Sequence, residues 1–343
     1  MSGIPDAMSG FVLFGRDPAR EAPDARRISD EPDWMQAEPA RIDRALQHAM
    51  RLPSGGWAVL DASDRIGRAP RPMQVAGRKL VVWRGPDGPR AAPQRCPHMG
   101  ASLCNGRVDE LGRIVCPWHG LALGDGAHGG WAPLPTHDDG VLSWVRLRSL
   151  LAAGETPTDA PTLPPRPKKF VAGVIRMEAV CEPRDIIANR LDPWHGPHYH
   201  PHSFLQLDVI DEGVTHVTVR VVYKVLGPLA MKVDARFHCP DPRTIVMTII
   251  AGDGVGSVVE THATPIDPTH TAVIEATLAT SDRSLFPWFA KANRWIRPLI
   301  ERRAKRLWVE DCDYAEQTFA VRAERSDQSP SGRPAMKPRG GIE

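Results

Sequence analysis

Two short segments of this chain each pair one cysteine with one histidine. They are Cys96-Pro97-His98 and, after a gap of seventeen residues, Cys116-Pro117-Trp118-His119. Two thiolates on one iron and two neutral imidazoles on the other can hold a [2Fe–2S] cluster of raised reduction potential. Zinc can use the same residue types, but its spacings usually group cysteine with cysteine and histidine with histidine. The mixed pairing therefore predicts a redox cluster clamped between two loops, in preference to a zinc site or four unconnected residues.

A second group of possible metal ligands lies between residues 189 and 202. Two histidines and one carboxylate, which leave open positions for O₂, are the ligand set of mononuclear non-haem iron(II). Gly196-Pro197 interrupts any helix here, so periodicity does not decide which histidines bind. An alternative is that Asp192-Pro193 caps a helix and the histidines lie in a solvated loop. The candidates are Asn189, Asp192, His195, His198, His200 and His202.

The third iron ligand is expected far downstream, in a segment with apolar residues at helical spacing. Asp311 lies three residues after Trp308 and four before Ala315, on the apolar face of that segment. A lone carboxylate is costly there unless it is paired or bound to a metal. Asp311 is therefore the candidate, with an ion pair to an arginine as the alternative. We expect Glu310 and Asp313 to be solvated.

The surrounding chain divides by composition into an N-terminal arm, a β region, a linker and a second β region that ends in a helix. Residues 1–40 are expected to form a partly disordered arm, and a short helix is predicted over 42–51. Residues 41–150 have the short apolar runs, broken by glycine and proline, of a small antiparallel β domain. Residues 151–169 are proline-rich and predict a linker. Alternating patterns in 213–227, 231–238, 244–250, 257–264 and 271–280 then predict an antiparallel sheet of about five strands.

The end of the chain is expected to be helical and then disordered. The helix should start with Ser284 as its N-cap, and Pro298 should kink it or start a new one. Residues 326–343 are predicted to be a disordered tail. Gly252-x-Gly254-x-Gly256 is followed by another strand pattern rather than a helix, so we expect a hairpin turn there and no dinucleotide fingerprint.

These motifs together resemble the Rieske non-haem iron oxygenase family. Cys96-Pro97-His98-Met99-Gly100-Ala101 and Cys116-Pro117-Trp118-His119-Gly120 are similar to its two cluster loops, and Asn189-x-x-Asp192-x-x-His195-x₄-His200 is similar to its iron segment. The resemblance implies His195, His200 and Asp311 as ligands of the mononuclear iron, with His198 as a substitute for His200. It implies that Asp192 bridges a ligand histidine to the cluster of a neighbouring subunit in a homotrimer.

The same resemblance implies an α+β fold. A small antiparallel Rieske domain should precede a catalytic domain over 170–325, with a helix-grip (START-like) arrangement of a curved antiparallel sheet and a long C-terminal helix. The segment Gly120–Gly126 lacks the aromatic-rich sequence common in the family, which indicates a distinct branch.

Bulk composition excludes several other classes. The formal net charge of +2 gives no reason to expect nucleic acid as a partner. No stretch is apolar enough for a membrane span, and the six cysteines do not form the pattern of a secreted disulfide framework. We therefore expect a cytoplasmic protein.

The expected function is that of the oxygenase component of a multicomponent system, a mono- or dioxygenase. It would hydroxylate, demethylate or desaturate an apolar substrate with O₂ and electrons from a separate reductase or ferredoxin. A terpenoid, carotenoid or steroid-like compound is the expected substrate class, with Thr261, His262 and Thr264 as polar anchors. The alternatives are a Rieske ferredoxin-type electron carrier, which would lack the second iron, and a lipid-binding module with a structural cluster, which would consume no O₂.

Overall fold

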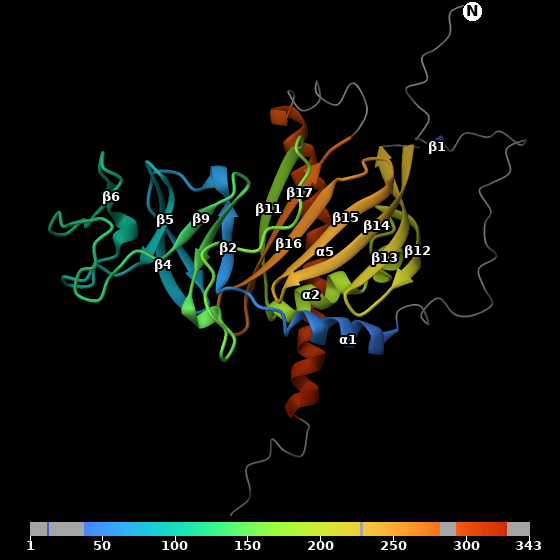
Figure 1. The fold of residues 1–343 in the computed structure, drawn as a ribbon, viewed down its shortest axis with the longest axis horizontal. Helices are drawn as coiled ribbons and strands as arrows, with labels where there is room; N and C mark the ends of the chain where they lie inside the picture. Colours follow the sequence, from blue (N-terminus) through green and yellow to red (C-terminus); the bar gives the residue numbers. More distant parts are fainter. Residues whose placement is uncertain (1–11, 14–37, 227–228, 282–292, 328–343) are drawn as a thin grey trace, which may run out of the picture.

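The computed structural model describes residues 12–13, 38–226, 229–281 and 293–327. Small sheets gather at one end of the molecule, and a large sheet with the helices fills the other (Figure 1). The α+β class and the predicted order are confirmed: a small β region first, then a curved sheet packed against a long C-terminal helix.

The first region consists of three antiparallel sheets of three strands each, in the orders β2-β10-β9, β3-β4-β5 and β6-β7-β8. The third sheet is made of two-residue strands, so its loops form most of that end of the molecule. Its strands and those of the other two sheets are β2 (Trp57–Ala62), β3 (Arg71–Val75), β4 (Arg78–Gly85), β5 (Gly88–Pro93), β6 (Arg107–Val108), β7 (Ile114–Val115), β8 (Ala122–Leu123), β9 (Thr136–Asp138) and β10 (Leu142–Arg146).

The large sheet is antiparallel and has the order β11-β17-β16-β15-β14-β13-β12, with the short β1 beside β14. All five predicted strands are present, and β11 and β12 were not predicted. The three glycines at 252, 254 and 256 form the turn between β15 and β16, as expected, and all have positive φ. The strands are β1 (Val12–Leu13), β11 (Val171–Ala179), β12 (Phe204–Glu212), β13 (His216–Leu226), β14 (Leu229–Asp241), β15 (Thr244–Gly252), β16 (Val258–Pro265) and β17 (Thr271–Ala279).

Four helices are described, and they pack on the concave side of this sheet. They are α1 (Pro39–Ala49), α2 (Pro183–Leu191), α3 (His195–Tyr199) and α5 (Asn293–Asp327). The predicted short helix is α1, two to three residues earlier than expected. Pro298 lies inside α5 and does not start it, while the proposed cap at Ser284 falls outside the described residues.

The period-two pattern decides which side of the sheet each residue faces. Val217, Val219 and Val221 alternate with polar neighbours and are buried in the same core as Trp308 and Ala315 of α5. The opposite face of β16 and β17 packs against β2 and β10 of the first region. The sheet thus has the helices on one face and the small sheets on the other.

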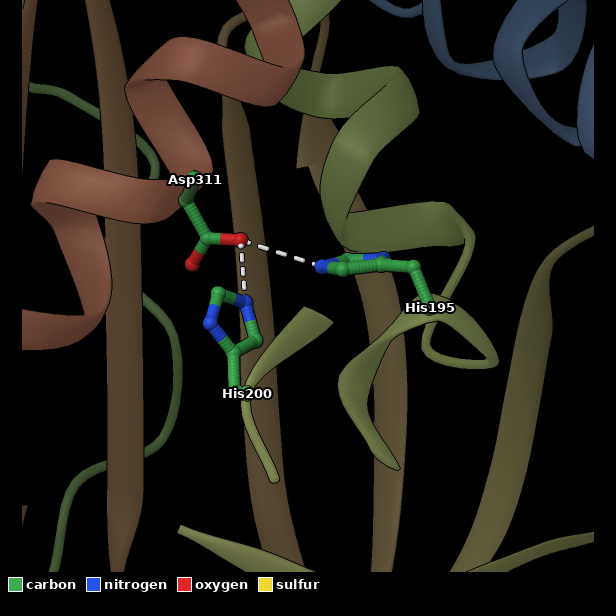
Figure 2. A group of neighbouring side chains, drawn as sticks. All are labelled: His195, His200 and Asp311. Atoms are coloured by element: carbon green, nitrogen blue, oxygen red, sulfur yellow. Dashed lines mark hydrogen bonds and ion pairs between the residues drawn. The ribbon is translucent and has the colours of Figure 1, made fainter. Parts of the chain in front are cut away.

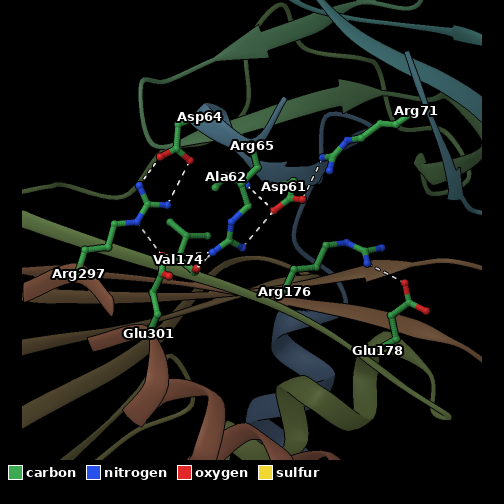
Figure 3. Close-up of polar contacts among 10 residues, drawn as sticks. All are labelled: Asp61, Ala62, Asp64, Arg65, Arg71, Val174, Arg176, Glu178, Arg297 and Glu301. Atoms are coloured by element: carbon green, nitrogen blue, oxygen red, sulfur yellow. Dashed lines mark hydrogen bonds and ion pairs between the residues drawn. The ribbon is translucent and has the colours of Figure 1, made fainter. Parts of the chain in front are cut away.

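Charged side chains join the first region to the large sheet. Arg65 donates to the Val174 carbonyl (2.6 Å) and to Glu301 of α5 (3.2 Å), and Arg297 pairs with Asp64 (Figure 3). A second connection comes from the proline-rich segment. There, Arg166 bridges Glu260 of β16 (2.5 Å) to Asp139 (3.0 Å), which in turn accepts a hydrogen bond from Trp144. The segment predicted as a linker is therefore held to both parts by ion pairs.

Candidate metal centres

The two cysteine–histidine segments form a pair of loops with the same backbone hydrogen bonds. In residues 96–101 the Cys96 amide donates to the Ala101 carbonyl and the Gly100 amide donates back to the Cys96 carbonyl, both at 2.9 Å. In residues 116–121 the Cys116 amide donates to Leu121 (2.9 Å) and the Gly120 amide to Cys116 (3.1 Å). Both glycines have positive φ, 77° and 71°, which glycine adopts without a steric penalty. We call these two segments the cluster loops.

The four side chains predicted to hold the cluster converge between the cluster loops. Cys96 and Cys116 are buried and lie beside each other, and burial together with this neighbour raises the pKa of Cys96. The Nδ1 atoms of His98 and His119 are 3.3 Å apart. Two adjacent thiols and two imidazole nitrogens that face each other are the donor set of a [2Fe–2S] cluster with mixed ligands.

The histidine side of the cluster loops is open to solvent. His98 and His119 are exposed, and so are the neighbouring Met99 (64%) and Trp118 (62%). Large exposed apolar side chains around a polar site are typical of a surface that contacts another protein.

The second predicted site is assembled from α3, the residue that follows it, and α5, with Asp311 lying 116 residues after His195 and 111 after His200. His195, His200 and Asp311 each offer one ligand atom, and these atoms lie within 4.8 Å of one another. Figure 2 shows Asp311 Oδ1 facing both imidazoles, with His195 Nε2 and His200 Nε2 each at 3.0 Å. Two histidines and one carboxylate that converge from one side match the donor set of non-haem iron(II).

Hydrogen bonds behind the triad fix its imidazoles. His195 Nδ1 contacts the Asp192 backbone carbonyl, and His200 Nδ1 lies 2.5 Å from Glu310 Oε2. Each Nδ1 faces an acceptor, and each Nε2 faces Asp311. With a metal bound, a proton held at Nδ1 would leave the Nε2 lone pair to bind the metal. Glu310, predicted to be solvated, is only partly so (32% exposed), since the approach of α3 turns it toward His200. Asp313 is exposed, as predicted, and accepts a hydrogen bond from Tyr199 (2.6 Å).

Electrostatics keep the Asp311 carboxylate ionised. It is 3% exposed, and burial alone would raise its pKa. The hydrogen bonds from His195 and His200 outweigh burial and hold the pKa of Asp311 well below its usual range. Burial would lower the pKa of His200, but Asp311 and Glu310 raise it. An ionised carboxylate in a buried pocket is ready to bind a cation.

Asn189 and Asp192 lie at the end of α2, beside the triad. The start of α2 is fixed because Asp185 accepts a hydrogen bond from the Glu182 amide (3.0 Å). Asn189 Nδ2 donates to Asp311 Oδ1 (3.1 Å), so it orients the carboxylate. Asp192 accepts a hydrogen bond from Tyr314 (3.1 Å) through Oδ2, and its buried Oδ1 has no partner among the described residues.

Tyr314 was not anticipated as a site residue. Its ring stacks on His195, with centroids 4.8 Å apart, while its hydroxyl binds Asp192. Its position three residues after Asp311 on the inward face of α5 was the available signal. The other candidate ligands are not part of the triad: His198 is exposed, and His202 lies 3.7 Å from Glu310.

A cavity of about 50 Å³ adjoins the triad, between α2 and the strands β13 to β15. Its wall is mostly apolar, and its polar members besides the triad are Asn189, Arg190 and Tyr223. The predicted anchors Thr261, His262 and Thr264 do not line it. The side chains of His262 and Thr264 face the small sheets, where they contact Trp144 and the Val59 carbonyl, because alternate residues of β16 point away from the cavity.

Comparisons with known proteins agree with both parts of this description. The family model described as a domain of unknown function (DUF5914) matches residues 152–326, more than half of the chain. The Rieske [2Fe-2S] domain model matches residues 56–147. Among the described helices, none is both long and apolar enough to cross a membrane.

Sequence relatives match through a short segment. The chain is 40% identical over 74 residues to the vanillate O-demethylase oxygenase subunit of Pseudomonas sp. (strain HR199), which is 21% of each chain. It is 43% identical over 74 residues to pheophorbide a oxygenase of Oryza sativa subsp. japonica, which is 21% of this chain and 14% of that one. The matched part therefore spans about a fifth or less of these curated relatives.

Structural similarity extends over most of the chain. This chain aligns with the crystal structure of dicamba monooxygenase bound to dicamba with a TM-score of 0.57 and 18% sequence identity. The alignment covers 83% of this chain and 92% of the dicamba monooxygenase chain. At this identity, the similarity shows a shared fold.

Proposed function

This chain belongs to the DUF5914 family and, through its Rieske domain and fold, to the Rieske non-haem iron oxygenases; on that premise we propose that it is the oxygenase component of a multicomponent system. The observation that carries the proposal is the convergence of His195, His200 and Asp311 beside a largely apolar cavity. A simple electron carrier has no use for such a second site. The reaction class is O₂-dependent hydroxylation, demethylation or desaturation.

We assign Cys96, His98, Cys116 and His119 to a [2Fe–2S] cluster and the triad to a mononuclear iron. When bound, these groups supply one-electron transfer and O₂ activation. The residues around them set the geometry. Asn189 orients Asp311, Glu310 fixes the tautomer of His200, and the Asp192 carbonyl fixes that of His195.

Asp192 is assigned a role between subunits. A fourth protein ligand would fill a position that O₂ needs, so we place Asp192 as a link between His195 and a cluster histidine of a neighbouring copy. The exposed His98 and His119 support this arrangement. Figure 1 supports it too, since the sheet that carries the cluster loops and helix α2 lie in different parts of the same chain. A homotrimer with head-to-tail contacts would supply such a neighbour.

The remaining assignments follow the same proposal. Electrons come from a separate reductase or ferredoxin, and the names of relatives such as an "oxygenase subunit" fit a system of several components. The substrate is apolar over most of its surface, because the cavity wall is apolar. We place the protein in the cytoplasm, with its domains at 41–150 and 170–325.

A mixed assembly tests the proposal. The variants His119→Ala, which lacks the cluster, and His195→Ala, which lacks the iron site, should each be inactive alone. Co-expressed with different tags and purified through both, they should regain part of the substrate-dependent O₂ consumption. No recovery in assemblies shown to contain both chains would contradict transfer between subunits. No O₂ consumption by the wild type with any reductase, or only two irons per chain, would contradict the oxygenase function itself.

A further inference from the structure

Arg190 is the residue of the iron cavity that the proposed chemistry does not use. It follows Asn189 in α2, and among the described residues that line the cavity it alone carries a permanent positive charge. Its guanidinium lies over the rings of Phe237 (5.5 Å to the centroid) and Trp308 (5.8 Å). An arginine thus faces a chamber whose other walls, outside the triad, Asn189 and Tyr223, are apolar.

The carboxylates of Asp311 and Glu275 act electrostatically on the Arg190 guanidinium, but neither forms an ion pair with it. No hydrogen bond or ion pair joins it to any described residue, and its Nε is buried without an acceptor. The carboxylate of Asp311 is already bound by His195, His200 and Asn189. Arg190 is half-buried, and a guanidinium in a mostly apolar wall with no hydrogen-bond acceptor favours an acceptor from outside the chain.

Glu275 of β17 is the other buried acid on this side of the sheet, and it does not fill the role. Its Oε2 accepts a hydrogen bond from Trp308 Nε1 (2.6 Å) and none from Arg190. Burial raises the pKa of Glu275, and the nearby charge of Arg190 offsets this only in part. Because Glu275 accepts from Trp308 and not from Arg190, the guanidinium keeps its hydrogen-bond donors for another acceptor, while the cation–π contacts position Arg190 without neutralising it.

We infer that the substrate is a carboxylic acid whose carboxylate binds Arg190, with the carbon skeleton held by the apolar wall next to the triad. The planar guanidinium can bind a carboxylate through two parallel hydrogen bonds, which fixes orientation as well as position. Tyr223 offers a second donor, since among the described residues its hydroxyl bonds only to the weak acceptor Met247 Sδ (3.7 Å). This inference rests on the proposed function and narrows its substrate from apolar compounds in general to apolar acids.

A pair of probes that differ only in charge tests the inference. We would titrate the full chain, with its metals bound, with benzoate and with benzamide, and follow tryptophan fluorescence and the unfolding midpoint. Benzoate should bind about tenfold or more tightly than benzamide, as expected for hydrogen bonds to a charged group. Arg190→Met should remove that preference, and Arg190→Lys should keep part of it because the charge remains. Arg184→Met, on the same helix but away from the cavity, should leave the preference intact.

Glu275→Gln separates anion binding from a structural role. If Arg190 serves only to neutralise Glu275, Arg190→Met should lower the unfolding midpoint, and adding Glu275→Gln in the double variant should restore it. In that case the wild type should also bind benzoate no more tightly than benzamide. Equal affinity of the wild type for the two probes would overturn the inference, and so would a preference that survives Arg190→Met. Because binding is read without turnover, this result is distinguishable from a failure of the oxygenase function.

Discussion

The two metal centres are built in opposite ways. The cluster loops are two local segments with matching hydrogen bonds, buried cysteines and exposed histidines. The iron triad joins residues up to 116 positions apart and depends on hydrogen bonds from Asp192, Glu310 and Asn189. The first is organised by its own backbone, whereas the second exists only when α3 and α5 have packed against the sheet. The cluster loops should therefore tolerate changes elsewhere in the fold better than the iron triad.

Removing one ligand from each centre should have the largest effect and should separate the two. The wild type should hold about three irons per chain, two in the cluster and one in the triad. His119→Ala should abolish the Rieske EPR signal, and His195→Ala should leave that signal intact while lowering iron content by about one. Loss of the cluster signal in His195→Ala would show that the centres are not independent.

Asp192→Asn should separate turnover from metal binding. Asparagine keeps the backbone carbonyl that binds His195, so the cluster and most of the mononuclear iron should remain. Turnover should nevertheless be lost, because the carboxylate that we propose as the link between the two centres is gone. Iron analysis, EPR and product formation on one preparation would check this, and normal turnover would disprove the assigned role.

Glu310→Gln should weaken only the triad. Loss of the anionic acceptor for His200 Nδ1 should lower affinity for the mononuclear iron about 10- to 100-fold, as for other groups that orient metal ligands. The matched control is Asp313→Asn, which changes the partner of Tyr199 instead. Iron titration of both variants should show the loss in Glu310→Gln alone, with an unchanged cluster spectrum in each.

Glycine substitutions should give the smallest difference between the two centres, measured as a change in the unfolding midpoint. Gly120→Ala puts a side chain at φ 71° in a cluster loop, where space is open but the conformation costs about 1 kcal/mol. Gly196→Ala, beside the triad, places a Cβ 3.5 Å from Phe204, an ordinary contact, in a helix that favours alanine. Calorimetry should therefore show a lower unfolding midpoint for Gly120→Ala and little change for Gly196→Ala. A reversed order would contradict the view that backbone conformation organises the cluster loops.

The sequence was most informative where function depends on neighbouring residues. The cluster loops could be identified from spacing because their ligands lie within a few residues of a turn. Asp311 was found through the burial of its helix face, since a carboxylate next to Trp308 needs a partner. How Asp311, His195 and His200 act is still a prediction, although the structure brings them together.

What could not be predicted depends on packing between distant segments. Strand β12 was missed because register shifts near Phe204 and Val209 disrupt the period-two pattern. The contact of Glu310 with His200 arises from the approach of α3 to α5, which helical spacing alone does not contain. The period-two pattern predicted the alternation of side chains along β16 correctly. It could not show which face of the strand the small sheets would cover, so His262 and Thr264 were wrongly predicted to face the cavity.

The ion pairs of Arg166 limit how this protein can be taken apart or recombined. Glu260 is 0% exposed, and its guanidinium partner comes from the segment between the two parts, which also holds Asp139 of the first region. A fragment that begins after that segment would lose Arg166 and would uncover the apolar face of β16 and β17 that the small sheets bury, a severe cost to its folding. A chimera made from two family members would have to take the segment with Arg166 and both acids, Asp139 and Glu260, from the same parent. The two halves therefore depend on each other structurally, although their chemistries are separable.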